Sequence, residues 1–204
     1  MRDLPGNDQA LERGTNMKNF LIIIGVLAVI GLMVFGWYKN GYNRVITLDE
    51  QVKSSWAQVE NQLQRRFDLV PNLVNTVKGY ASHESQIFTE VTKLRSQWAS
   101  APTVPEKVEA ANQLTGVLSR LIAVSENYPD LKANQNFLEL QAQLEGTENR
   151  ISVERMRYNQ AVQLFNAYQR SFFGRFFASQ TGLMQPAVYF KADERSKEVP
   201  KVTF

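Results

Sequence analysis

The chain has 204 residues, with 23 Lys and Arg against 20 Asp and Glu and a formal net charge of only +3. This charge balance does not indicate a nucleic-acid partner, because nucleic-acid-binding domains usually concentrate basic residues on one face. The absence of Cys excludes disulfides, lipoprotein anchoring, thiolate metal sites and cysteine nucleophiles, and a single His cannot supply a His-rich metal site. We therefore expect no metal ion and no other cofactor.

An uncharged segment of 20 residues lies near the N-terminus, from Asn19 to Tyr38. A helix of that length rises about 30 Å, the thickness of the hydrocarbon core of a bilayer. A cleavable signal peptide would have a shorter apolar stretch and a small-x-small site after it. This segment ends instead in Trp37, Tyr38 and Lys39, which is typical of an interfacial anchor. We therefore predict a transmembrane helix over residues 17–38.

The residues on either side of this segment do not determine its orientation. Residues 1–16 are polar, contain Pro and Gly and lack apolar periodicity, so they are predicted to form a disordered extension. Basic residues flank the segment almost equally, with Arg13 and Lys18 before it and Lys39 and Arg44 after it. The positive-inside rule therefore does not decide which side of the membrane the rest of the chain occupies.

After the segment, apolar residues recur at successive steps of 3, 4, 4, 3, 4, 4 and 3. This 11-residue repeat predicts one stripe along a long, nearly straight helix. Pro71 is expected to kink or break that helix near residues 68–72. The stripe consists of Val45, Leu48, Val52, Trp56, Val59, Leu63, Phe67 and Val70.

Three further helices are expected: one from about residue 82, one from Pro105 to about Tyr128, and one over residues 134–173. The predicted fold class is all-α. An N-terminal transmembrane helix is followed by an antiparallel up-and-down four-helix bundle over residues 39–176, with long first and last helices. An irregular C-terminal tail over residues 177–204 is expected to pack on the bundle.

The predicted helix lengths are unequal, about 60 Å for the first and last helices and about 25–35 Å for the middle two. Part of the long pair would then lack neighbours. Its bare seam would have to be covered by the tail, by another subunit or by a different protein.

An even number of helices returns the last helix to the membrane. Its end is rich in aromatic and basic residues, and such a patch beside the bilayer can bind anionic headgroups and interfacial lipid. The alternative interpretation is that the phenylalanines are core residues at the end of the bundle. The predicted patch comprises Arg170, Phe172, Phe173, Arg175, Phe176 and Phe177.

A set of polar residues is predicted to make contacts between helices. An arginine-carboxylate bridge would pin the kink at Pro71, with Arg155 as the partner of Asp68. The asparagines would fix helix register through paired hydrogen bonds, although a ligand pocket at the kink could use the same residues. The set comprises Arg65, Arg66, Asp68, Asn72, Asn75, Arg155, Asn159 and Asn166.

Several strings in the chain resemble the LemA family. The longest is Gln-Leu-Gln-Arg-Arg-Phe-Asp-Leu-Val-Pro-Asn-Leu-Val at residues 62–74, and Tyr-Pro-Asp-Leu-Lys-Ala follows at residues 128–133. The run of Phe residues at 172–177 is richer in aromatics than the family pattern. The remaining matches are residues 77–81, His83, Glu84, Phe137, Leu140, Arg155, Tyr158, Asn159, Val162, Asn166, Gly182, Phe190, Ala192, Pro200, Val202 and Phe204.

The resemblance covers residues from about 17 to 204. It implies a bacterial membrane protein with an N-terminal anchor, a helical-bundle domain and no established biochemical activity. Some members are exported as lipoproteins, which favours a bundle outside the cytoplasm.

The residues themselves give no positive support for an enzyme, because no Gly-rich phosphate loop and no nucleophile elbow is present. The leading hypothesis is a non-enzymatic single-pass protein of the bacterial inner membrane. Its periplasmic bundle would serve protein contacts as a homo-oligomeric scaffold, with other membrane or envelope proteins as further candidate partners. The alternative is a membrane-lipid-binding or membrane-shaping module that uses the aromatic and basic end of the last helix. A weaker third hypothesis is a sensor that binds a small ligand at the kink.

Overall fold

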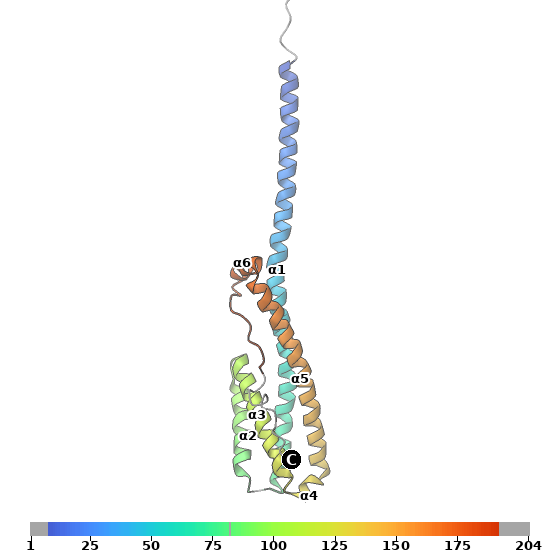
Figure 1. Cartoon of the computed structure of the whole chain (residues 1–204), viewed down its shortest axis with the longest axis vertical. Coiled ribbons are helices and arrows are strands. Elements are labelled where there is room, and N and C mark those ends of the chain that lie inside the picture. Colours follow the sequence, from blue (N-terminus) through green and yellow to red (C-terminus); the bar gives the residue numbers. More distant parts are fainter. Residues whose placement is uncertain (1–7, 82, 192–204) are drawn as a thin grey trace, which may run out of the picture.

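A computed structural model describes residues 8–81 and 83–191 of the chain (Figure 1). These residues form six helices and no strand, so the predicted all-α class is confirmed. The number of helices differs from the four that were expected beyond the membrane segment.

The first helix, α1, runs without interruption from Asp8 to Lys78. Its apolar segment is long enough to span a membrane, with a mean hydropathy of 2.7 over 18 residues and none of that window buried in the protein. In Figure 1 this half of α1 stands alone above the other helices. Residues 8–16 belong to α1, where the sequence predicted a disordered extension. Residues 1–7 of that predicted extension lie outside the described residues.

The predicted break at Pro71 is absent, because α1 continues through it for seven more residues. A proline inside a helix removes one backbone hydrogen bond and crowds the preceding turn. Here the buried stripe continues on both sides of the proline, since Val70 and Leu73 are each 1% exposed and Val77 is fully buried. Packing along this stripe keeps the helix continuous despite the local cost.

The remaining helices are shorter, and most begin at an identifiable cap. They are α2 (Ser85–Ser100), α3 (Val104–Ser125), α4 (Pro129–Lys132), α5 (Gln135–Arg170) and α6 (Phe172–Thr181). A capping box opens α3: the Thr103 hydroxyl accepts a hydrogen bond from Glu106 N, and the Glu106 carboxylate accepts one from Thr103 N. The side chain of Asn134 caps α5 in the same way by accepting from Phe137 N at 3.1 Å.

The long helices α1 and α5 lie side by side, and the α2–α3 hairpin lies beside their far end (Figure 1). At 1.5 Å per residue, α5 is about 54 Å long and α2 and α3 about 24 and 33 Å. The predicted inequality of helix lengths is therefore confirmed. As expected, the last long helix returns to the end of the apolar segment, where the Tyr168 hydroxyl donates to Gly41 O at 3.2 Å.

Two apolar clusters fill the interior. The larger one lies between α1, α2, α3 and α5 and includes a stacked pair, Phe67 and Trp98, with ring centroids 4.6 Å apart. The smaller one joins α1, α5 and α6 and consists of Val45, Leu48, Phe165 and Phe177. The smaller cluster therefore fixes α6 near the apolar end of α1.

The end of the chain differs from its prediction in two respects. The irregular tail was expected to begin at residue 177, but residues 177–181 belong to α6, which runs to Thr181. Residues 192–204 of that predicted tail lie outside the described residues. The fourth predicted helix was expected to run to residue 173, but α5 ends at Arg170 and Ser171 begins a separate helix, α6. After Gly182 the chain runs without regular secondary structure over residues 183–191, as expected for the tail. This segment, which we call the strap, turns back along α5, and Phe190 at its end is 3% exposed. The strap covers the seam that the short α2 and α3 leave open.

Candidate membrane-interface site

The helix α6 docks on α1 where the apolar segment ends. The ring of Phe177 is 1% exposed and lies with its centroid 5.2 Å from Trp37 and 5.6 Å from Tyr38. It also packs directly against the backbone of α1 at Gly41, where an added Cβ would lie 2.1 Å from the ring. The predicted interfacial anchor of Trp37 and Tyr38 is thus also the docking surface for α6, while Lys39 is exposed beside it.

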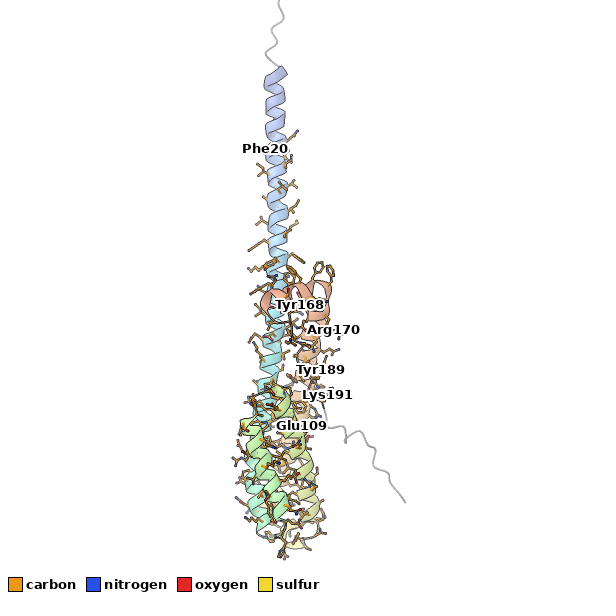
Figure 2. The ribbon with its side chains drawn as sticks, turned by 90° about the vertical axis from the view of Figure 1, so that its left-hand side faces the viewer. Phe20, Glu109, Tyr168, Arg170, Tyr189 and Lys191 are labelled. Carbon is orange, nitrogen blue, oxygen red and sulfur yellow. The ribbon has the colours of Figure 1, made fainter. Side chains whose placement is uncertain are left out.

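Three phenylalanines of α6 remain exposed. Phe172 is 87% exposed, Phe173 54% and Phe176 47%. At 100° per residue they fall within an arc of about 100° on the helix surface. Phe173 also meets the ring of Trp37 edge-on at 5.2 Å. These side chains, with Trp37 and Tyr38, form a continuous exposed aromatic surface at the end of the apolar segment, and α6 lies across α1 at this level (Figures 1 and 2).

The structure separates the two interpretations of the phenylalanine run residue by residue. Phe177, which the sequence placed in a membrane-surface patch, is a core residue. Phe172, Phe173 and Phe176 are not core, because they stay exposed at the end of the domain. Gly174 and Ala178 share the buried face with Phe177, which explains why one α6 face packs and the other does not.

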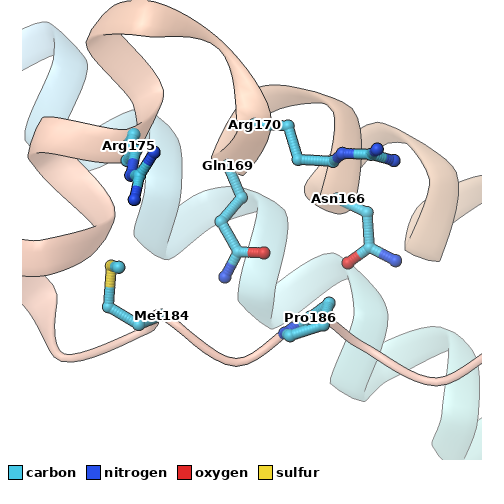
Figure 3. Close-up of a pocket in the computed structure, with 6 residues that line it drawn as sticks. All are labelled: Asn166, Gln169, Arg170, Arg175, Met184 and Pro186. Carbon is cyan, nitrogen blue, oxygen red and sulfur yellow. The ribbon is translucent and has the colours of Figure 1, made fainter.

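A pocket of about 500 Å³ opens beside this aromatic surface, between α5, α6 and the strap (Figure 3). Arg170 and Arg175 lie on either side of Gln169, and two apolar side chains of the strap line the pocket below them. Neither arginine forms an ion pair with another described residue. The full lining is Asn166, Gln169, Arg170, Arg175, Met184 and Pro186.

Side-chain amides of α5 hold the strap by its backbone. Asn159 donates to Phe190 O at 3.0 Å and accepts from Phe190 N at 2.9 Å. Asn166 makes the same pair with Ala187, at 2.9 Å in both directions. Gln169 donates to Leu183 O at 2.6 Å and to Gln185 O at 3.2 Å. We call these three side chains the amide ladder. They supply the strap with the hydrogen bonds that a neighbouring β-strand would otherwise give.

Tyr158 adds a fourth attachment, because its hydroxyl donates to Val188 O at 2.7 Å. Burial raises the pKa of the Tyr158 hydroxyl above its ordinary value, so the neutral, donating form is favoured. The guanidinium of Arg155 lies 5.5 Å from the ring of Phe190, a cation–π contact at the end of the strap.

We expect Asn166→Ala to loosen the strap without unfolding the helices. The substitution removes two hydrogen bonds to Ala187, and each is worth about 1 kcal/mol. Hydrogen–deuterium exchange of residues 183–191, measured on the full chain in mild detergent, should become about 30-fold faster, which corresponds to about 2 kcal/mol. The matched control is Asn149→Ala, which makes the same substitution at an exposed position of the same helix. Unchanged strap exchange in Asn166→Ala would contradict the role of the ladder.

The predicted polar contacts fall into two groups. Asn159 and Asn166 do make paired hydrogen bonds, but to the strap and not to another helix. Arg65, Asn72 and Asn75 are exposed. Asn72 and Asn75 line a shallow polar hollow with residues of α5, so they do not fix register from inside the protein.

The predicted bridge between Asp68 and Arg155 is wrong. Asp68 is exposed and accepts a hydrogen bond from Gln64 on its own helix, while Arg155 stacks on Phe190. The arginine that does bridge helices is Arg66, which is 6% exposed and meets the Glu148 carboxylate of α5 at 2.7 Å. Burial lowers the pKa of Arg66, and the charge of Glu148 opposes this shift.

Several residues of the site were missed by sequence reasoning. Gln169 and Glu148 have no distinguishing local pattern, since polar residues at those spacings usually face solvent. Gly41 carried a usable signal, because it lies on the same helical face as Val45 and Leu48, four and seven residues later. Among the described residues, no group of three His, Asp or Glu side chains converges as metal ligands.

A model of the LemA family matches residues 55–204, from the middle of α1 to the end of the chain. The chain belongs to the LemA family. It is 22% identical over 193 residues to Protein LemA of Metamycoplasma hominis, spanning 93% of this chain and 87% of that protein. It is 24% identical to Magnetosome protein MamQ 2 of Paramagnetospirillum magneticum, spanning 93% of this chain and 78% of that protein. Magnetosome protein MamQ of Magnetospirillum gryphiswaldense is 21% identical, over 75% of this chain and 65% of that protein.

The LemA strings found in the sequence meet in space. The string at residues 62–74 lies on α1 and supplies buried Leu63, Phe67 and Val70 to the larger apolar cluster. The string at residues 128–133 forms α4, whose Leu131 is fully buried. On α5 the matching residues Arg155 and Asn159 contact the matching Phe190 of the strap, and Asn166 holds the strap at Ala187. The matches at residues 192–204 lie outside the described residues. Much of the LemA pattern in this chain therefore lies in the core and in the attachment of the strap.

Proposed function

We propose that this LemA-family chain is a non-enzymatic single-pass membrane protein that works as a lipid-surface module. The apolar segment of α1 would span the bilayer, and α6 would lie in the interface beside it. The observation that carries this proposal is the docking of α6 at Trp37 and Tyr38, with Phe172, Phe173 and Phe176 left exposed at that level.

The free energy of removing three phenylalanines from water supports this placement of α6. Three large exposed aromatic side chains on one short helix are costly in water, and each is worth about 1.5–3 kcal/mol when it is removed from water. Beside the end of a membrane span, those side chains meet the headgroup and acyl boundary, where an interfacial helix gains this free energy. The same membrane contact explains why the aromatic face of α6 can stay uncovered by protein.

The depth of α6 can be measured because the chain contains no Cys, so one introduced cysteine can be labelled cleanly. Gln180 is exposed and falls within the same arc as the three phenylalanines. A nitroxide on Gln180→Cys, in the full chain in lipid nanodiscs, should collide with oxygen more than with a water-soluble nickel chelate. The control label on Met156→Cys, 55% exposed on α5, should show the reverse.

A second pair of substitutions tests the cause. Phe172→Ser with Phe176→Ser should shift the label at position 180 toward the nickel chelate, because the apolar contact with lipid is lost. The critical comparison is made with all three phenylalanines in place. If the label on Gln180→Cys is then as accessible to the nickel chelate as the label on Met156→Cys, α6 does not lie in the interface and the proposal fails.

The homo-oligomeric scaffold remains a second candidate for a narrower reason than the sequence suggested. The open seam that motivated it is covered by the strap. The exposed side of α5, however, carries Val153, Met156 and Leu164, which are 43%, 55% and 55% exposed. Such apolar side chains on one helix can serve protein contacts. A strictly monomeric full-length chain in mild detergent would contradict self-association.

For its location we propose the bacterial inner membrane, with the helical domain on the periplasmic side. Membership of the LemA family and the single apolar segment support a membrane location. Reporters fused after Phe204, one active only in the cytoplasm and one only outside it, test the orientation. A cytoplasmic signal would overturn the periplasmic assignment.

A further inference from the structure

We propose that the pocket between α5, α6 and the strap binds the phosphate group of an anionic phospholipid. This inference rests on the proposed interfacial position of α6 and adds a specific ligand to it. It makes the surface selective for headgroup charge, whereas the phenylalanines alone would favour any bilayer.

The first argument is the position of the pocket relative to the aromatic surface. On α6, Arg175 lies about 60° beyond the edge of the phenylalanine arc, on the side away from Phe173. If the phenylalanines rest in the interface, the guanidinium extends along the flank of the helix toward the phosphate layer. Long basic side chains commonly reach headgroups in this way. Arg170, the last residue of α5, lines the same pocket.

The positive charge of this part of the chain also supports an anionic ligand. Between Arg155 and Lys191 the chain has five basic residues and no acidic one. Arg157 is paired with Glu154, and Arg155 lies over the ring of Phe190. Arg170 and Arg175 have no ion pair with any described residue, so their charges are available to a ligand. A planar guanidinium can donate two parallel hydrogen bonds to the oxygens of one phosphate, so arginine suits this ligand better than lysine.

The third argument is the lining of the pocket. Gln169 donates to two strap carbonyls and Asn166 donates to one, so the two arginines supply the charged groups that could recognise an anion. Met184 and Pro186 supply an apolar side to the pocket. A cationic rim beside an apolar wall fits a phosphate joined to the glycerol and acyl part of a lipid. A free phosphate ion would use only the rim.

The test is retention of lipid by the full chain, measured by native mass spectrometry in mild detergent with phosphatidylglycerol or phosphatidylcholine added. Phosphatidylglycerol should bind more tightly to the unsubstituted chain. Arg170→Gln with Arg175→Gln should weaken its binding about 25-fold, since each basic residue near an anionic surface contributes about fivefold. Binding of phosphatidylcholine should stay unchanged.

Two matched variants make the result specific. Arg157→Gln removes the same charge from an exposed, already paired site on α5 and should leave phosphatidylglycerol binding within about twofold of the unsubstituted chain. Arg170→Lys with Arg175→Lys keeps the charge but not the planar fork and should recover only part of the binding. Equal losses in the Arg157 control and the double Gln variant would overturn the proposal, because they would show a diffuse charge effect.

Two further outcomes would also overturn it. The first is equal retention of the two lipids by the unsubstituted chain. The second is displacement of phosphatidylglycerol by millimolar inorganic phosphate, which would identify the site as one for a free anion. The nitroxide measurement at position 180, repeated with both arginines replaced by Gln, separates the two proposals. We expect the label to stay in contact with lipid there, so loss of headgroup selectivity alone would not count against the interfacial position of α6.

Discussion

Gly41→Leu is expected to displace α6 from α1 and to lower the free energy of unfolding by about 3 kcal/mol. An added Cβ at this position would lie 2.1 Å from the Phe177 ring. Phe177 is only 1% exposed and packs on Trp37 and Tyr38, so displacing its ring would break these contacts. Losing a buried phenylalanine costs about 3–5 kcal/mol, and the better helix propensity of leucine returns about 1 kcal/mol. Urea unfolding of the full chain in detergent, followed by tryptophan fluorescence, measures the change.

The matched control for this prediction is Gly36→Leu, where no atom lies within 4 Å of the added Cβ. We expect no measurable loss there. A double-mutant cycle with Phe177→Ala identifies the cause, because Phe177→Ala should cost much less in the Gly41→Leu background than alone. Full additivity of the two losses would contradict direct packing of Phe177 on Gly41.

The second large effect is expected at the buried ion pair of Arg66. Glu148→Gln should lower the free energy of unfolding by about 2–3 kcal/mol, because it leaves the guanidinium buried without a countercharge. This value is below the usual cost for a buried pair because the Glu148 side chain is 45% exposed and water screens part of the interaction. Denaturant unfolding of the full chain at neutral pH checks the value.

A second variant, Arg66→Met, removes the other member of the ion pair. Arg66→Met should cost less than Glu148→Gln, although it removes the larger and more buried side chain. Arg66 Nε has no hydrogen-bond partner among the described residues, and the Thr115 hydroxyl that meets Nη1 also bonds to Ala111 O. An apolar chain of similar length removes the desolvation cost of the guanidinium charge. The Glu148 side chain is 45% exposed, so its carboxylate can turn its buried Oε2 toward water. If Arg66→Met proves the more damaging change, the ion pair is net stabilising and the argument is wrong.

Much of the fold could be predicted because apolar spacing is a local property of the chain. Six of the eight residues in the predicted 11-residue stripe of α1 are buried, and Val52 and Trp56 are partly buried against the same core. The Pro at residue 105 indicated the start of α3 to within one residue. The continuity of α1 through Pro71 could not be predicted, because packing against α5 decides it and local propensity does not. The division at Ser171 depends on the Ser171 hydroxyl, which accepts from Gly174 N at 3.1 Å and begins a new helix.

The site was predictable in composition but not in partners. The sequence correctly placed aromatic and basic residues at the end of the returning helix. It could not separate Phe177 from Phe176, because the two differ only in which side of α6 faces α1. The asparagines at 159 and 166 gave a correct signal of shared orientation, seven residues apart. Their partner was misassigned because an irregular strap has no periodicity to reveal where it lies.

The helix α1 runs unbroken from the apolar segment to the far end of the domain, so a tilt at one end moves the other. From Lys39 to Lys78, α1 continues for about 60 Å beyond the proposed membrane span without a break. A thin bilayer makes a long span tilt, and a tilt of about 10° would swing the far end sideways by about 10 Å. The same tilt would press α6 into the interface on one side or lift it on the other. If α1 spans the bilayer as proposed, bilayer thickness and the tilt of the whole domain would therefore be coupled.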